Sequence, residues 1–163
     1  MGQISYQKTV EKWGVLEVTC QGSDKGNPFT ERYIRGCFTG AQECVQVDGF
    51  YDGDGIYKVR FMPSFEGRYA FRIEGNYADE GCIEGSFEVT APSECNHGPV
   101  RVANTYHFAY EDGTPYYSVG TTCYVWNLRS DEEIAQTLET LKQSAFNKIR
   151  FCVFPKHYDY NLG

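Results

Sequence analysis

The chain has 163 residues, of which 41% are hydrophobic and 23% charged, and its formal net charge is −7. That length allows one ordinary domain or two small ones, but it excludes a complete eight-fold β/α barrel, which needs about 250 residues. The acidic balance, without a cluster of Lys and Arg, disfavours nucleic acid and anionic membranes as partners and leaves neutral or cationic small molecules, and proteins, as candidates.

The N-terminus and the cysteines bear on the expected compartment. Residues 1–6 contain neither a basic nor a long apolar stretch, so we expect no secretory signal. No apolar run reaches the roughly 18 residues of a membrane helix. The seven cysteines are odd in number, irregularly spaced and without a C-x-x-C pair. This pattern disfavours a zinc site and favours free thiols, so we expect a cytoplasmic chain without a metal or other cofactor.

Residues 8–90 predict a series of short strands. Segments with alternating or continuous apolar side chains recur at 13–20, 33–38, 44–47, 56–61, 69–73 and 85–89. Asp52-Gly53-Asp54-Gly55 is a strong hairpin-turn signal between two of them. No helical period interrupts the series, so we predict an Ig-like antiparallel β-sandwich over residues 1–92. Its expected core consists of apolar strand residues, namely Trp13, Val18, Phe38, Val59, Phe61 and Phe71.

The pattern changes after this region. Residues 93–100 combine Pro, Gly, Ser and Asn, which predicts a linker. Strands are then expected at 102–110 and from 116 onward, on either side of a second hairpin signal, Glu111-Asp112-Gly113-Thr114.

The last part of the sequence predicts a β-α-β unit. Ser130 and Glu133 have the spacing of a capping box, which marks the start of a helix. Apolar residues follow at helical spacing, at Ile134, Leu138, Leu141 and Ala145, and Asn147 can stop the helix. A predicted strand at 119–126 precedes the helix, and an apolar run at 149–154 follows it. This order predicts two parallel strands, which need further strands beside them.

Strings on both sides of the linker resemble one family. Residues 49–63, followed by Glu66-Gly67, resemble the N-terminal sandwich that precedes apiosidase-like bacterial glycoside hydrolases. Further strings resemble the start of the barrel in those enzymes, at residues 96–102, 113–116, 120–124 and 146–150. The resemblance implies a mainly β chain, in which the sandwich is followed by the opening β-α-β of a (β/α)8 barrel over residues 101–163.

The resemblance also implies a function. The family's fold implies a retaining glycosidase whose acid/base follows the fourth barrel strand and whose nucleophile follows the seventh. This sequence reaches the second strand, so we assign no catalytic residue and expect the chain alone to be inactive. Candidate substrate-binding residues lie at the carboxyl ends of the first two strands, where a barrel builds its site: Tyr124, Trp126, Arg150, His157 and Tyr158. The implied partner is a carbohydrate, a plant-polysaccharide side chain, bound through the complete barrel.

Several of these residues have a second interpretation. By resemblance, Arg150 lies beneath the nucleophile and keeps it ionised. From the residues alone, it could equally point outward beneath a helix. His157 and Tyr158 could belong to an ordinary surface loop. An exposed sugar-binding platform could include Trp13, Phe50, Tyr51, Tyr57 and Tyr69. The alternative function is therefore a non-catalytic carbohydrate- or protein-binding sandwich; the sequence specifies no oligomeric state.

Overall fold

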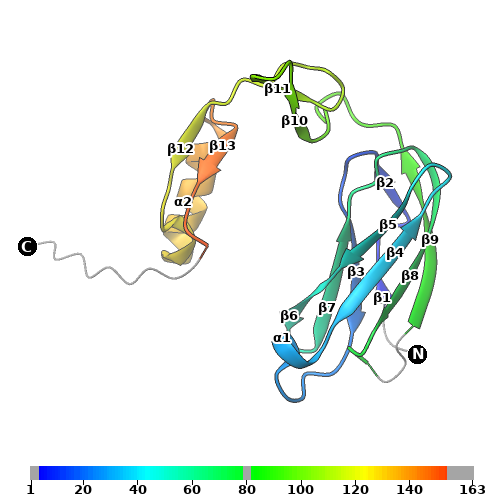
Figure 1. Cartoon of the computed structure of the whole chain (residues 1–163). Helices are drawn as coiled ribbons and strands as arrows, with labels where there is room; N and C mark the ends of the chain where they lie inside the picture. Colours follow the sequence, from blue (N-terminus) through cyan, green and yellow to red (C-terminus); the bar gives the residue numbers. More distant parts are fainter. Residues whose placement is uncertain (1–3, 79–81, 154–163) are drawn as a thin grey trace, which may run out of the picture.

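The computed structural model describes residues 4–78 and 82–153. A two-sheet sandwich occupies the first part of the chain, and a short hairpin then leads to a separate β-α-β unit (Figure 1). Within these described ranges, none of the helices has the length and apolar character needed to cross a membrane.

The sandwich consists of a four-stranded and a five-stranded sheet. The first sheet has the order β1 (Ile4–Ser5), β3 (Leu16–Gln21), β7 (Ile56–Phe61), β6 (Phe50–Gly53). The second has the order β2 (Thr9–Glu11), β9 (Cys82–Thr90), β8 (Gly67–Gly75), β4 (Ile34–Thr39), β5 (Cys44–Asp48). The predicted mainly β sandwich is confirmed. The expectation of purely antiparallel pairing was wrong for β2, which pairs in parallel with β9.

The core lies between the two sheets because alternate side chains of each strand point inward. Of the predicted core residues, Val18, Phe38, Val59, Phe61 and Phe71 are buried. The two sheets meet through aromatic contacts, and the ring of Phe38 stacks on that of Phe61 with centroids 4.4 Å apart. Among the described residues, every buried apolar side chain lies between Leu16 and Val89.

Trp13 does not belong to this core, contrary to the prediction. Its backbone is left-handed, with φ of 64°, so the alternation of β3 begins only at Leu16. The Trp13 N–H donates to the carbonyl of Pro63 over 2.9 Å, and the side chain is half-buried at the end of the sandwich.

The predicted hairpin turn connects β6 and β7. Gly53, Asp54 and Gly55 all have positive φ, which glycine and aspartate tolerate best. Two members of the alternative aromatic platform, Tyr57 and Tyr69, are only 1% exposed and belong to the core. A short helix, α1 (Pro28–Glu31), precedes β4 and is capped by the side chain of Asn27.

The chain leaves the sandwich through a segment held by side chains on both sides. The Ser93 N–H donates to Glu11 Oε2 over 2.6 Å, and Asn96 Nδ2 donates to the Lys12 carbonyl over 3.1 Å. A Cβ at Gly98 would lie 2.7 Å from Cδ2 of Trp13, so the indole packs directly on this backbone. We call these contacts of residues 11–13 with residues 93–98 the joint.

A hairpin follows the joint. β10 (Val100–Ala103) and β11 (His107–Tyr110) are antiparallel. The expected single strand over 102–110 was therefore wrong, because Asn104 and Thr105 have left-handed backbone and reverse the chain. The predicted second turn is present: the Tyr110 N–H donates to the Thr114 carbonyl over 2.8 Å.

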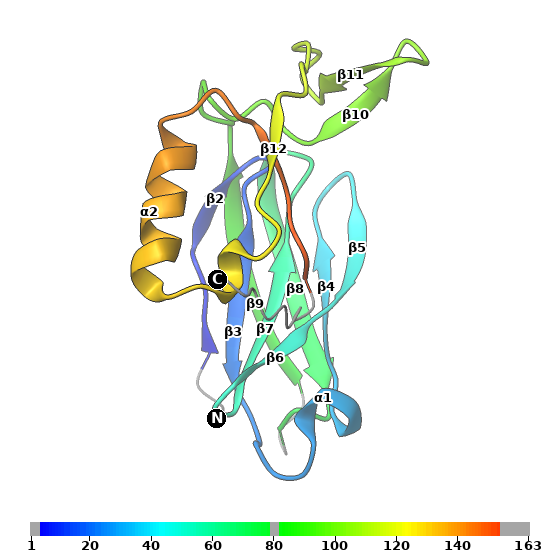
Figure 2. The same ribbon diagram turned by 90° about the vertical axis from the view of Figure 1, so that its left-hand side faces the viewer.

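The β-α-β unit is confirmed as local structure. β12 (Gly120–Thr122) and β13 (Lys148–Arg150) are parallel neighbours, and α2 (Asp131–Lys142) connects them along one face of the pair (Figures 1 and 2). The capping box is present: the Glu133 N–H donates to Ser130 Oγ over 3.3 Å, and the Ser130 N–H donates to Glu133 Oε2 over 3.2 Å.

Two boundaries of this unit differ from the prediction. The first strand ends at Thr122, and a 3-10 turn, η1 (Trp126–Leu128), replaces its expected last residues. The helix ends at Lys142, before the predicted stop at Asn147. Asn147 instead connects the strands: its Oδ1 accepts the Val119 N–H over 2.9 Å, and its Nδ2 donates to the Tyr117 carbonyl over 2.8 Å.

Candidate functional site

Two predicted site residues, Tyr124 and Arg150, meet where the parallel strands end. The Cys123 N–H donates to the Arg150 carbonyl, and the Cys152 N–H donates to the Tyr124 carbonyl, each over 2.9 Å. These bonds extend the pairing of β12 and β13 past their last residues and fix the two backbones side by side. The Arg150 Cζ lies 5.5 Å from the centre of the Tyr124 ring, a cation–π contact.

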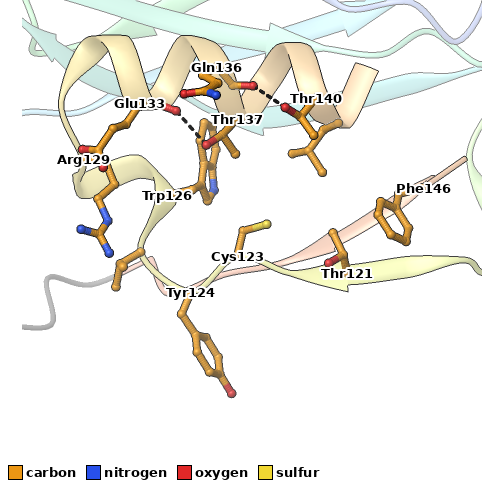
Figure 3. Close-up of a pocket in the computed structure, with 12 residues that line it drawn as sticks. Thr121, Cys123, Tyr124, Trp126, Arg129, Glu133, Gln136, Thr137, Thr140 and Phe146 are labelled. Atoms are coloured by element: carbon orange, nitrogen blue, oxygen red, sulfur yellow. Dashed lines mark hydrogen bonds between the residues drawn. The ribbon is translucent and has the colours of Figure 1, made fainter. Parts of the chain in front are cut away.

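Both side chains of this pair are accessible. Tyr124 is 50% exposed, and its ring points away from α2 (Figure 3). Arg150 is also exposed. Its guanidinium therefore needs no buried counter-charge in this chain, in contrast to an arginine enclosed in an apolar strand. The pair presents an aromatic face and up to five N–H donors at one edge of the two-stranded sheet.

Trp126 lies on the other side of the strands. It begins η1 and points toward α2 (Figure 3), and its ring packs edge-on against Phe151 with centroids 5.9 Å apart. The indole N–H is buried without a hydrogen-bond partner among the described residues. Trp126 forms a wall of an open hollow of about 640 Å³, together with Cys123, Thr137 and Phe146.

The structure thus brings Tyr124 and Arg150 together and separates Trp126 from them by the plane of the strands. The remaining two candidates, His157 and Tyr158, lie outside the described residues. The sequence predicted Asn147 as a helix stop and as part of the string 146–150 that resembles the barrel start, but it did not predict that the Asn147 amide connects the two strands. The spacing Asn147-x-x-Arg150 places this amide directly before β13, the strand that ends at the arginine.

The β-α-β unit carries a large uncovered apolar surface. No residue of α2 is buried, although its Leu138 belongs to the predicted apolar stripe. Apolar and aromatic side chains of the unit that are at least 40% exposed are Val119, Tyr124, Leu128, Leu138, Phe146, Phe151 and Val153. Exposed apolar groups gathered on one small unit are typical of a surface that another segment covers.

Part of the chain matches a known family, and most of it is similar to a solved structure. Residues 9–76 match a domain of unknown function (DUF5060). The crystal structure of "a putative glycoside hydrolase" from Bacteroides vulgatus ATCC 8482 is similar over 93% of this chain, with 37% sequence identity and a TM-score of 0.84. This chain covers 30% of the Bacteroides vulgatus chain. Since the similarity extends over 93% of the chain, it includes the β-α-β unit as well as the sandwich.

Two further solved structures show weaker similarity to this chain. The Lin-41 filamin domain is 14% identical with a TM-score of 0.41, over 56% of this chain and 93% of its own. The CARDB domain of the PF1109 protein from Pyrococcus furiosus is 11% identical with a TM-score of 0.36, over 56% of this chain and 93% of its own. The comparison with curated proteins gives no match.

Proposed function

We propose that this chain is the N-terminal part of a glycoside hydrolase. The sandwich is an accessory domain, and β12, α2 and β13 are the opening unit of a (β/α)8 catalytic barrel. The observation that carries the proposal is a parallel β-α-β unit with an uncovered apolar surface, which follows a DUF5060 domain in the same chain. The 37% identity to the Bacteroides vulgatus protein supports the enzymatic class.

The packing of the unit supports a larger barrel around it. Parallel sheets occur almost only where both faces are covered, and two strands are too few to be stable alone. Phe151 and Val153, directly after β13, are 40% and 83% exposed. Further β/α repeats would bury these side chains and the open edge of the sheet.

The proposed substrate site includes the Tyr124–Arg150 pair. In a β/α barrel, the site lies at the carboxyl ends of the strands, where this pair is found. The Tyr124 ring offers a face for stacking on a sugar ring. The Arg150 guanidinium can donate hydrogen bonds to hydroxyl groups, or it can keep a neighbouring carboxylate ionised. His157 and Tyr158, which follow the second strand in sequence, belong to the same proposal. Since Trp126 points toward α2, we assign the sugar contact to the pair rather than to the indole.

The chemistry itself requires groups that we assign to later strands. Retaining hydrolysis uses two carboxyl groups about 5–5.5 Å apart, one as nucleophile and one as acid/base. The proposed contribution of this chain is therefore one wall of the site. The implied substrate is a plant-polysaccharide side chain.

The test compares the complete gene product with the chain of 163 residues, against aryl glycosides and plant oligosaccharides. We expect turnover only from the complete product. Arg150→Met in that product should lower kcat by roughly 10²-fold, the usual cost of losing one charge-stabilising donor, with an unchanged Tm. Arg101→Met is the matched control, because Arg101 is also exposed and pairs with Glu111 on the hairpin. Full activity of the Arg150→Met variant, or a gene without further β/α repeats after Gly163, would contradict the proposal.

We also propose a reducing compartment, the cytoplasm, for this chain. The seven cysteines are all free in the structure. Thiol titration of the unfolded protein without reductant should therefore detect all seven. A smaller number that reductant restores to seven would contradict the assignment.

A further inference from the structure

The outer face of the β4–β5 hairpin carries a pair of thiols. The Sγ atoms of Cys37 and Cys44 are 3.8 Å apart, and Cys44 Sγ lies 3.5 Å from Thr39 Oγ1. In the strand register Thr39 is opposite Cys44 and Cys37 is opposite Gln46, so the thiols are diagonal neighbours. The intervening Phe38 points into the core. The thiols and Thr39 therefore share the face that points away from the sandwich interior.

The two thiols have different environments. Cys44 is exposed on β5, the last strand in the order of its sheet, whereas Cys37 is half-buried on β4. Hydrogen bonds from the Thr39 hydroxyl and from the Cys37 thiol lower the pKa of Cys44. The same contact with Cys44, together with burial, raises the pKa of Cys37. Cys44 is thus the better nucleophile, and Cys37 is the thiol that retains its proton.

The charged residues on the adjacent strand β8 do not reverse this difference in pKa between Cys44 and Cys37. Arg72 of β8 is opposite Cys37, and Glu74 lies two residues further along the same strand. The negative charge of Glu74 also raises the pKa of Cys37. Arg72 Nε lies 3.8 Å from Glu74 Oε2, so the carboxylate compensates part of the positive charge of Arg72.

We propose that Cys44 is an oxidation site for hydroperoxides and that Cys37 is its resolving thiol. The Cys44 thiolate attacks one oxygen of the hydroperoxide, the O–O bond breaks, and the sulfur becomes a sulfenic acid while the other oxygen leaves as an alcohol or water. The Cys37 sulfur then attacks the sulfenic sulfur, an S–S bond forms, and the hydroxyl leaves as water with the Cys37 proton. Two thiols and one hydroperoxide give one disulfide, one alcohol or water, and one further water. A small thiol reductant reverses the change by exchange.

The position of the pair allows the necessary movement. The sulfurs must approach from 3.8 Å to the roughly 2.05 Å of a disulfide. Cys44 is the first residue of β5, directly after the turn in which the Gly40 N–H donates to the Glu43 carbonyl. The adjustment therefore falls at the end of a hairpin on β5, an edge strand that pairs only with β4 among the described residues.

The chain contains its own controls for this site. Cys82 and Cys95 are also exposed, and neither has a second thiol at hydrogen-bonding distance among the described residues. A general sensitivity of exposed thiols would oxidise all of them at similar rates. The proposed mechanism predicts selective oxidation of Cys44, followed by a single intramolecular cross-link.

The experiment treats the reduced full chain with one equivalent of hydrogen peroxide and maps each cysteine by peptide mass spectrometry. We expect a Cys37–Cys44 cross-link, loss of two thiols per chain, and full recovery with dithiothreitol. Cys37→Ser should leave a Cys44 sulfenic acid that dimedone traps, and Thr39→Val should slow the first step. Cys82→Ser, the matched control, should behave as the parent chain.

Two results would overturn the proposal. One is oxidation of Cys44 no faster than that of Cys82 and Cys95. The other is a parent chain in which Cys44 is oxidised but no Cys37–Cys44 cross-link forms. Circular dichroism of each variant establishes that the sandwich is folded before the rates are compared.

Discussion

Truncation of Phe38 to alanine tests the aromatic core that joins the two sheets. Phe38 is 0% exposed, and its ring stacks on Phe61 of the opposite sheet at 4.4 Å and an interplanar angle of 7°. It also approaches Phe71 at 5.8 Å and Phe87 at 6.4 Å. A fully buried Phe→Ala change costs about 3–5 kcal/mol. We expect the upper part of that range, because stacked pairs contribute about 0.5–1.5 kcal/mol beyond the buried area.

Such a loss is a large fraction of the stability of a small domain, which is about 5–15 kcal/mol. Each 1 kcal/mol corresponds to roughly 4–8 °C in the Tm of a domain of this size. Urea unfolding followed by circular dichroism gives the free energy of unfolding of the parent chain and the variant. Phe38→Leu, which keeps part of the volume, should lose less and should be measurable even if Phe38→Ala is largely unfolded.

The control for this prediction is Phe29→Ala on α1. Phe29 is 75% exposed, and its ring makes an edge contact with Tyr51 at 5.1 Å. We expect a change within about 0.5 kcal/mol, as for other surface positions. A loss below about 1 kcal/mol for Phe38→Ala, or an equal loss for Phe29→Ala, would refute the role assigned to the stacked rings.

Three further changes test other parts of the chain. A Cβ at Gly49 would lie 2.4 Å from the Lys58 carbonyl oxygen, so Gly49→Ala should lower the free energy of unfolding by about 1–3 kcal/mol, and an unchanged urea midpoint would contradict this. Ser130→Ala removes the helix cap and should destabilise α2 by about 0.5–2 kcal/mol, seen as faster amide exchange in the helix; unchanged exchange would count against the cap. The Ser93 N–H lowers the pKa of Glu11. The resulting stabilisation is present above the unfolded pKa and is lost as the pH falls through the lower folded pKa. The Ser93 amide signal in NMR should therefore shift with acid in the parent chain but not in Glu11→Gln; the same shift in both would exclude Glu11 as its cause.

The elements that could be predicted from the sequence are those specified by nearby residues. Ser130 and Glu133 lie three positions apart, so their capping box marks the helix start without any tertiary information. Trp13 was misplaced because its left-handed backbone depends on the carbonyl of Pro63, which is distant in sequence. β2 was missed for a similar reason: Thr9–Glu11 is three residues long and becomes a strand by pairing with β9.

In the candidate site, too, some features could be predicted from the sequence and others could not. Residues 124 and 126 would share a face of a continuous strand, since side chains alternate with a period of two. The 3-10 turn η1 interrupts the strand, so the two side chains do not share a face. Trp126 points toward α2, and Tyr124 points the opposite way (Figure 3). The contact of Tyr124 with Arg150 depends only on the parallel pairing of two strand ends, which the β-α-β pattern predicts.

The joint at the end of the sandwich has a consequence for recombination between related genes. Glu11, Lys12 and Trp13 precede β3, whereas their partners Ser93, Asn96 and Gly98 come after β9. An exchange that replaced residues 1–92 alone would place a different loop against residues 93–98. The Ser93 N–H would then lose its acceptor on Glu11, and the Gly98 backbone would lose its contact with the Trp13 indole. The smallest segment that can be inherited or transplanted with these contacts intact therefore extends to Gly98, several residues beyond the last strand of the sandwich.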